Sequence, residues 1–525
     1  MPVGPAIATA PMDWLTRVRQ PDVREFSRRW LAIFAGSLAL FVVRFLVPSP
    51  VGMADNGDGP RLMCGLGVAP VTGGHVRYDA YAYFVFDPSP ACGNAGLYAS
   101  SEHVLLDAAR WLTPVLALPG TVNLIALGLV ICALQAAGIA SLACGLRFSL
   151  RATIVIAFGL WLALADAAFF DTYASPYSEG ATLTGLLLVC AGVLYLGRGP
   201  LALAFGLLLE GVGGYLTIFS KEQYLPLVLP IGVVIVVASA SAAPVGWRRF
   251  LTARTAAAGA VAGLLIVGTV AYVHQDATSP FATALHQEQV VDVIFDDIVN
   301  GHDNAAADLH ALGLPASWAS YAGDGFWAPH SVYHDPLYPE YTSRLTDANL
   351  ARFLLTHPMA LLKVGQQAAD DALVLRVNYL GSYAPSAGQP EAAIENRVTV
   401  LESIVQAIPT GLGLLWLLPL WAAMAAVAVW ALRRRHRVRW QHDSAYAVLL
   451  LVGCAVAGFI PAAYFAGVET TRHMLGTNLA TALAFILSAT LTGSMVRRSI
   501  ADEGAGPDDG AESGGEPAAR VAVTA

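Results

Sequence analysis

Long apolar stretches recur along the whole chain and alternate with polar segments. Each stretch holds roughly 17 to 24 residues, the length that crosses about 30 Å of hydrocarbon as an α-helix. About ten of them are present, at 30–47, 121–144, 152–170, 180–197, 201–219, 224–240, 255–274, 411–432, 445–466 and 474–496. The pattern predicts an all-α polytopic membrane protein with about ten transmembrane helices.

Two polar segments, 48–120 and 275–410, are much longer than a connection between neighbouring helices requires. The first contains SSEHVLLDAARWL, whose apolar residues follow helical spacing. The second contains FATALHQEQVVDVIFDDIVNG and TDANLARFLLTHPMALLKVGQQ, which have the same period and flank an irregular piece rich in Pro, Tyr and Trp. We therefore expect two large extracytoplasmic loops that bear amphipathic helices at the membrane surface.

These boundaries divide the chain into five parts. They are a cytoplasmic N-terminal segment (1–29), the first seven transmembrane helices (30–274, including the first loop at 48–120), the large extracytoplasmic loop (275–410), the last three helices (411–498), and a cytoplasmic tail (499–525). The tail consists mainly of Gly, Ala and acidic residues, so we expect it to be disordered.

Composition agrees with a membrane protein and says little about other partners. The chain is 56% hydrophobic and only 13% charged, with a mean hydropathy of +0.57, which is more apolar surface than a soluble core of this size could bury. Six of the acids behind the net charge of -8 lie in the tail. We expect the lipid bilayer to be a partner and nucleic acid not to be one.

Arginines predict the orientation in the membrane. Basic residues favour cytoplasmic loops, and they occur before the first apolar stretch and in every second connection, at Arg17, Arg19, Arg24, Arg28, Arg29, Arg147, Arg151, Arg198, Arg248, Arg249, Arg254, RRRHRVR (433–439), Arg497 and Arg498. Both termini are therefore expected in the cytoplasm of a plasma (inner) membrane protein. No small-residue cleavage site follows the first stretch, which we interpret as an anchor.

Two of the six cysteines, Cys64 and Cys92, share the first long loop. On this topology the loop faces an oxidising compartment, so a disulfide bond between them is a candidate. The other four lie within apolar stretches, where a thiol acts as a small apolar side chain.

Ionisable residues cluster at the outer ends of the predicted helices. They are Asp55, Asp58 and Arg61 after the first helix, Asp171 and Glu179 in DTYASPYSEGA, Lys221 and Glu222 in FSKEQYLP, and Glu469, Arg472 and His473 in GVETTRHMLG. Charges near a bilayer tend to mark function, although a solvated structural role is common at helix ends. Carboxylates there can act as a general base or hold a divalent cation, while Arg, Lys and His can bind an anionic head group. Together these residues describe a site for a lipid phosphate.

Three features occur together: an Asp-bearing loop with a surface helix after the first span, a Lys motif at a middle helix end, and an Arg/His motif before the last span. In this combination the chain resembles the GT-C superfamily of membrane glycosyltransferases. Within it, the chain is most similar to bacterial cell-surface glycan hexose transferases and mannosyltransferase-like families. The resemblance covers nearly the whole chain, although each motif is short. It implies a polyprenyl-phosphate sugar as donor and an active site on the extracytoplasmic face.

The resemblance also implies roles for individual residues. In ADNGDGPRLM, Asp58 would be the general base, with Asp55 as the competing choice and Arg61 as a neighbour that keeps the base ionised. Lys221, Arg472 and His473 would bind the donor phosphate. Glu222 follows Lys221 where many relatives carry Gly, and the loop has no Asp-x-Asp, so metal dependence, with Mg²⁺ or Mn²⁺ as the candidates, stays open.

For several further residues, both a functional and a structural role agree with the sequence. Asp79, Asp171, Glu179, Glu222 and Glu469 could contact the acceptor or the sugar, or could cap helix ends. The aromatic residues of 318–341 could stack on sugar rings or belong to an interfacial belt. Glu210 lies in the middle of a span and could couple to a proton or serve structure. His330 and His334 lack the glutamate of a metalloprotease motif and are flanked by prolines, so we set them aside.

The sequence therefore predicts transfer of a sugar, a hexose on the resemblance, from a polyprenyl-phosphate donor to a cell-envelope glycan or lipid-linked acceptor. A glycan ligase or polymerase, a secondary transporter and a non-catalytic assembly protein are the alternatives. A transporter built from inverted halves would show an internal repeat and charge at the midplane. The sugar, the acceptor, the stereochemical outcome and the oligomeric state are not encoded in any pattern that we can identify.

Overall fold

The computed structural model describes residues 23–74, 77–90, 92, 99–241, 252–277, 280–301, 304–434, 439–467 and 469–504. Within these residues nine helices are long and apolar enough to cross a membrane, and a bent pair gives a tenth. They are α1 (Val23–Leu46), α4 (Leu124–Gly145), α7 (Glu179–Leu196), α8 (Pro200–Ile218), η5 with α9 (Glu222–Leu227, Val228–Ala240), α10 (Ala253–Ala277), α17 (Gly413–Arg433), α18 (Arg439–Tyr464), α20 (Leu475–Gly504) and the pair α5 (Leu150–Leu164) with α6 and η4 (Ala167–Phe170, Asp171–Ala174). The predicted all-α polytopic membrane fold is confirmed.

The bent pair has an identifiable cause. The two halves meet at an angle of 60°, and Asp166 lies between them. Its carboxylate accepts the N–H of Ala168 (3.2 Å) and that of Leu401 (2.7 Å), so it begins α6 and ties this span to a distant segment. A polar cap inside an apolar stretch therefore breaks the predicted span 152–170 in two.

Helix α7 forms the centre of the bundle. Every one of its residues is buried, and it packs against α4, α8, α9, α18 and α20. Glycines allow its close approach to α8: a Cβ on Gly185 would lie 2.4 Å from the carbonyl oxygen of Gly213, and one on Gly192 would lie 3.0 Å from that of Gly206. Small residues at a helix interface are the usual route to tight packing between membrane helices.

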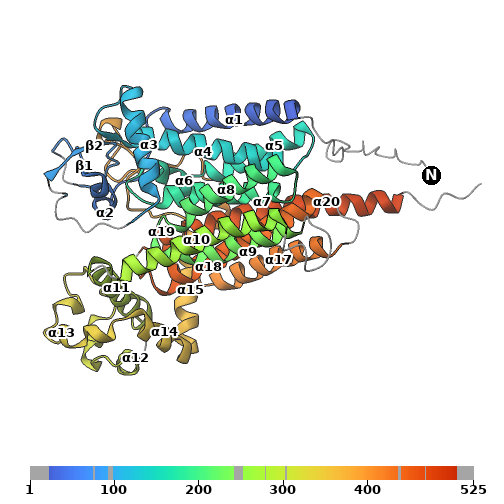
Figure 1. Cartoon of the computed structure of the whole chain (residues 1–525). Helices are drawn as coiled ribbons and strands as arrows, with labels where there is room; N and C mark the ends of the chain where they lie inside the picture. The colour runs from blue at the N-terminus through green and yellow to red at the C-terminus, as the bar shows by residue number, and fades with distance from the viewer. Residues whose placement is uncertain are drawn as a thin grey trace, which may run out of the picture.

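Both long loops lie at one end of the bundle (Figure 1). The described elements of both loops gather there, whereas α1 begins and α20 ends at the opposite end. Residues 1–22 of the predicted N-terminal segment and the tail beyond residue 504 lie outside the described residues. Helix α20 continues past the predicted end of the last span at 496 and into the predicted tail.

Basic residues at the loop-poor end bind the carbonyl groups of helix ends. Arg254 donates from Nη1 to the carbonyl of Leu196 (2.9 Å), and Arg439 donates to the carbonyl of Gly197. The carboxylate of Asp443 lies 3.5 Å from Arg198 and 3.7 Å from Arg439. Several of the arginines that predict the orientation therefore also satisfy the last carbonyls of α7.

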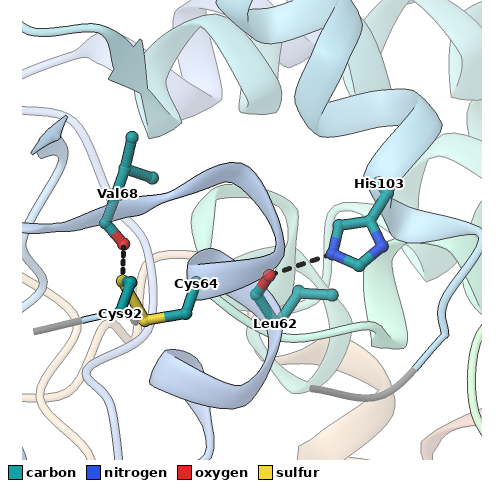
Figure 2. Close-up of a disulfide and its surroundings, with 5 residues drawn as sticks. All are labelled: Leu62, Cys64, Val68, Cys92 and His103. Carbon is teal, nitrogen blue, oxygen red and sulfur yellow. Dashed lines mark hydrogen bonds between the residues drawn. A yellow bond between two sulfur atoms is a disulfide. The ribbon is translucent and has the colours of Figure 1, made fainter. Parts of the chain in front are cut away.

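The first loop combines short elements with one surface helix. They are α2 (Gly59–Met63), η2 (Cys64–Leu66), β1 (Val68–Pro70), β2 (Val85–Pro88), α3 (Glu102–Val115) and β3 (Val122–Asn123), and the strands pair antiparallel in the order β1-β2-β3. In Figure 1, α3 runs across the direction of the spanning helices. A disulfide bond joins Cys64 to Cys92, and the imidazole of His103 on α3 bonds the carbonyl of Leu62 at 2.9 Å (Figure 2).

The second loop folds around a small core of its own. Its elements are α11 (Pro280–Asp292), the π-helical turn η7 (Val293–Ile298), α12 (Ala305–Ala311), η8 (Ala316–Tyr321), η9 (Val332–His334), α13 (Tyr338–Tyr341), η10 (Thr342–Arg344), α14 (Asp347–Thr356), α15 (Pro358–Val374), η11 (Pro385–Ala387) and α16 (Val400–Val405). Trp318 is fully buried at the centre, with Phe295, Tyr338 and Tyr341 around it. We call this part the outer domain.

A buried ionic network holds the last part of the outer domain, where the chain leads back to the bundle. Glu395 pairs with Arg44 of α1 and lies 2.6 Å from Arg397. Arg376 donates to the carbonyl of Glu395 and lies 3.2 Å from Glu402. Each of these buried charges has an opposite charge in contact, which buried charges require.

We predict that the two loop cysteines resist alkylation until the protein is reduced. The denatured chain should react at four thiols without reductant, because Cys132, Cys144, Cys190 and Cys454 are free, and at all six after reduction. Intact-protein mass after alkylation measures both numbers. Cys64→Ser provides the control, since it should expose one additional thiol, that of Cys92, without reductant. Reaction at six thiols in the non-reduced parent would contradict the pairing.

Candidate active site

A cavity of about 600 Å³ opens at the loop-bearing end of the bundle. Its walls come from the first loop, the start of α7, the connection between α8 and η5, the outer domain and α19 (Thr470–His473). Eight of the residues proposed from sequence line it: Asp58, Arg61, Glu179, Lys221, Glu222, Glu469, Arg472 and His473. Segments more than four hundred residues apart thus share one hollow.

The acidic loop after α1 is held in shape by Asp55. Its Oδ1 accepts the backbone N–H groups of Gly57 (2.8 Å) and Gly59 (2.9 Å). Gly57 has φ +113°, a conformation that residues with a Cβ rarely adopt, so the glycine is needed there. Asp55 does not line the cavity, because its carboxylate is occupied by the backbone of its own loop. This local folding turns Asp58 toward the cavity.

Asp58 is paired with two arginines. Its Oδ2 accepts from Arg472, and its Oδ1 lies 3.2 Å from Nη1 of Arg61. Burial disfavours the charged form of Asp58, but the positive charges of Arg472 and Lys221 outweigh that effect and hold the pKa of the carboxyl well below its usual range. The side chain is therefore a carboxylate at neutral pH.

Arg472 is the buried cation at the centre of the site. Its side chain is only 3% exposed, and it also contacts Glu469 (2.8 Å) and Glu179 (3.8 Å). Its Nε has no hydrogen-bond partner among the described residues. The guanidinium lies 4.4 Å above the centre of the Tyr177 ring, a cation–π contact.

Tyr177 is a residue that sequence reasoning missed. Its hydroxyl donates to the carbonyl of Ala54 (2.9 Å) and accepts the backbone N–H of Asn56 (2.7 Å). Asn56 in turn donates to Glu469 (2.6 Å) and accepts the N–H of Asp58 (3.1 Å). One tyrosine thus orients both the acidic loop and the arginine. Tyrosines are common beside any bilayer, so no sequence signal singled it out.

Lys221 and His473 form a second pair in the cavity wall. Lys221 Nζ lies 2.8 Å from His473 Nε2, and because lysine can only donate, the ring proton sits on Nδ1. Nδ1 is buried and has no hydrogen-bond partner among the described residues. Burial and the charges of Lys221 and Arg472 hold the pKa of His473 well below its ordinary value, so the ring is neutral and offers one unpaired N–H.

The outer domain supplies a wall that the sequence analysis did not propose. Glu288, Gln289 and Asp292 of α11 line the cavity with Trp327, and Glu288 lies 3.8 Å from Arg61. Burial raises the pKa of Glu288, and burial with nearby acids raises that of Asp292 to about 7. Glu288 and Asp292 are spaced i, i+4, so a helical reading of ALHQEQVVD could have placed both on one face. Only the fold shows that this face meets the cavity.

Three proposed residues lie elsewhere. Asp55 serves its own loop, as described above. Asp79 lies on the surface, 2.9 Å from Arg77. Asp171 is buried in the ionic network below the outer domain, where it accepts from Ser382 (2.6 Å) and lies 4.0 Å from Arg376. Neither Asp79 nor Asp171 lines the cavity.

The remaining candidates are also placed. Trp318 and Tyr338 belong to the core of the outer domain, whereas Trp327 is exposed in the cavity. Glu210 is fully buried in α8, with no hydrogen bond to either oxygen among the described residues. His330 lies beside Asp324 (2.8 Å). Among the described residues no three His, Cys, Asp or Glu side chains are arranged to hold a metal ion, and the carboxylates near Arg472 act as its ion-pair partners.

The arrangement can hold an anion beside a carboxylate base. The cations Arg61, Lys221 and Arg472 line the cavity together with Asp58, and His473 adds a buried N–H that has no partner among the described residues.

Comparison with known proteins shows which family the sequence matches. Residues 22–502 match the family described as the YfdI N-terminal transmembrane domain. A search of the curated proteins found no match.

We predict that His473 makes stability depend on pH. Its folded pKa lies below the unfolded value of about 6.5, so the unfolded chain takes up the proton first as the pH falls, and up to about 1.4 kcal/mol of stability is lost per pH unit below that value. The melting temperature of the parent, relative to that of His473→Gln, should therefore drop between pH 7.5 and pH 5.5. Thermal unfolding in detergent at the two pH values measures this difference, and an unchanged difference would contradict a neutral, buried His473.

Proposed function

We propose, from the premise that the chain belongs to the YfdI N-terminal transmembrane domain family, that it is a glycosyltransferase of the GT-C type. It would move a sugar, a hexose by resemblance, from a polyprenyl-phosphate donor to a cell-envelope glycan or a lipid-linked acceptor. The reaction would take place on the extracytoplasmic face of the plasma membrane.

One observation carries this proposal. Asp58, Lys221, Arg472 and His473 come from three separate connections between spans and line one cavity. Residues of both long loops and of the helix α10 line that cavity, so a lipid-linked donor would reach it from the neighbouring membrane helices. A phosphate attached to a lipid can reach such a site while its chain stays in the bilayer.

The residues suggest a division of labour. Lys221, the Nδ1–H of His473 and Arg472 would bind the phosphate, since charge-assisted hydrogen bonds to phosphate are the strong ones. The acceptor hydroxyl attacks the anomeric carbon, the bond from that carbon to the phosphate oxygen breaks, and the polyprenyl phosphate leaves as an anion. The hydroxyl proton passes to Asp58. Because the leaving group is already a stable anion, no separate acid is required.

The low pKa of Asp58 fits this sequence of events. Paired with Arg472, the carboxylate is a weak base. A bound phosphate would compete for the same guanidinium and weaken that pairing, which raises the basicity of Asp58 only when a donor is present. Donor binding and base activation are coupled through one side chain.

We predict that Asp58→Asn lowers sugar transfer at least about a hundredfold, the scale for removing a general base. The measurement is transfer of label from radiolabelled polyprenyl-phosphate hexoses to envelope acceptors by the purified protein. Asp79→Asn is the matched control, because Asp79 lies in the same loop outside the cavity and should keep parental activity. Melting temperatures of both variants show whether folding is preserved.

Other outcomes of this experiment have defined meanings. Normal transfer by Asp58→Asn together with loss in Asp55→Asn would move the base to Asp55. Normal transfer by both variants would overturn the catalytic assignment. The size of the product separates transfer of a single sugar from ligation or polymerisation of whole glycans, the closest enzymatic alternative.

We predict that Lys221→Gln raises the KM for the donor by about 10- to 100-fold, because a hydrogen bond to a charged group contributes roughly 1.5–3 kcal/mol. The KM for the acceptor should change little. The chain has one other lysine, Lys363, whose Nζ donates to the carbonyl oxygens of Ile298 and Asn300 away from the cavity. Lys363→Gln is thus the control, and an equal effect on the donor KM in both variants would contradict phosphate binding by Lys221.

A further inference from the structure

The cavity has two walls of different chemical character. The wall from the membrane helices and their connections carries the cations Arg61, Lys221 and Arg472, beside carboxylates of which Asp58, Glu179 and Glu469 contact Arg472. The wall from the outer domain carries Glu288, Asp292 and Trp327, and no cation among the described residues that line it. The outer wall therefore offers no charge that attracts a phosphate, and it suits a different ligand.

We infer that the outer wall, formed by Trp327, Glu288 and Asp292, binds the acceptor and that the bound group is a neutral carbohydrate. The inference rests on the proposed function, and it identifies where the second substrate of the reaction, the acceptor, binds. It chooses sugar stacking for Trp327, one of the two interpretations that the sequence analysis left open for the aromatic residues of 318–341, and adds Glu288 and Asp292, which the sequence analysis did not propose.

Trp327 presents the surface that a sugar ring needs. Its side chain is 72% exposed although it lines a cavity. The face of a pyranose ring that carries axial C–H bonds is its least polar surface, and it packs well on an open aromatic face. Tryptophan loses little conformational entropy when it provides such a contact, because it has only two rotatable bonds.

The position of Trp327 is fixed by the acids of α11. Its indole N–H donates to Glu288 Oε1 at 2.5 Å. The preceding residue, Phe326, donates its backbone N–H to Asp292 Oδ1 at 2.6 Å, and the rings of Phe326 and Trp327 meet edge to face at 5.2 Å. An exposed tryptophan that is held by its own bond to Glu288 and by the bond of the preceding residue to the buried Asp292 is positioned before any ligand arrives.

Glu288 also suits the hydroxyl groups of a sugar. A carboxylate has several acceptor sites, so Glu288 can accept from a sugar hydroxyl while keeping its bond to Trp327. Asp292, only 1% exposed, holds the backbone beside Trp327 in place. Gln289, on the same helix, lines the cavity as well and adds an amide. An aromatic face beside carboxylates and an amide matches a neutral polyol and disfavours an anion.

A chain of contacts joins this wall to the proposed base. Glu288 Oε2 lies 3.8 Å from Nη2 of Arg61, and Nη1 of Arg61 lies 3.2 Å from Asp58 Oδ1. A sugar placed on Trp327 would therefore lie within reach of Asp58. Because Arg61 contacts both Glu288 and Asp58, an acceptor bound at Glu288 would also alter the electrostatic environment of Asp58.

Saturation-transfer NMR on the full-length protein in lipid nanodiscs tests the inference directly. The probes are neutral hexose disaccharides and trisaccharides of gluco, galacto and manno configuration, with α and β linkages. We expect transfer to the axial ring hydrogens of at least one probe. This signal should fall at least about fivefold in Trp327→Ala, since stacking of this kind contributes on the order of 1 kcal/mol, and should persist in Trp327→Phe, which keeps an aromatic face.

Trp111→Ala is the matched control, because Trp111 is 80% exposed on α3 and lies outside the cavity. Binding of farnesyl phosphate should be unchanged in Trp327→Ala, which shows that the variant is folded. No signal from any probe in the parent, an unchanged signal in Trp327→Ala, or an equal loss in the alanine and phenylalanine variants would overturn the inference.

Transfer assays separate this inference from the proposed function. If transfer occurs, Trp327→Ala should raise the KM for the acceptor about tenfold and leave the KM for the donor unchanged. An unchanged acceptor KM would overturn the inference and leave the proposed function intact. Carbohydrate binding through Trp327 in a protein that transfers no sugar would uphold the binding site and refute the proposed function.

Discussion

The burial of one guanidinium organises the loop-bearing end of this protein. Arg472 has a side chain that is only 3% exposed, and a buried charge without partners is very costly. Its partners come from three places: Asp58 from the first loop, Glu179 from the start of α7, and Glu469 from its own turn. Removal of one member of such a group costs about 3–5 kcal/mol. The need to compensate Arg472 therefore holds these segments together and forms the cavity.

The same constraint makes the site responsive. In the described structure the arginine is neutralised by carboxylates, while Lys221 and the unpaired N–H of His473 lie beside it. On the proposed function, an arriving phosphate would compete with the carboxylates for the arginine, while Tyr177 keeps both the acidic loop and the guanidinium in place. Fixed charged groups with exchangeable ion pairs are what electrostatic preorganisation requires. On the further inference, the acceptor would bind at the outer wall, so the two substrates would occupy separate parts of one cavity.

The bilayer explains why this site lies where it does. Spanning helices must be apolar outside and closely packed inside, as α7 shows with its buried length and its glycine contacts to α8. Ionisable residues then gather mainly at the ends of the bundle, and Glu210 in α8 is an exception. At one end the arginines bind helix carbonyls and Asp443. At the other end the charges of several connections meet, and the outer domain closes over them through a core built on Trp318 and an ionic network around Glu395 and Arg376.

The sequence by itself determined the all-α membrane fold, because the length and apolarity of a span are local properties. It also placed Asp58, Lys221, Arg472 and His473 among few candidates, since charges beside a bilayer are scarce. Only the tertiary structure decided between neighbours of equal chemistry: Asp55 turns inward to its own loop while Asp58 faces the cavity, and Asp171 joins a buried network. Tyr177, Glu288 and Trp327 could not be singled out, because an interfacial aromatic or a helical acid looks the same in sequence whether it faces water or a cavity. That difference depends on which segments pack together, and packing between distant segments leaves no local pattern.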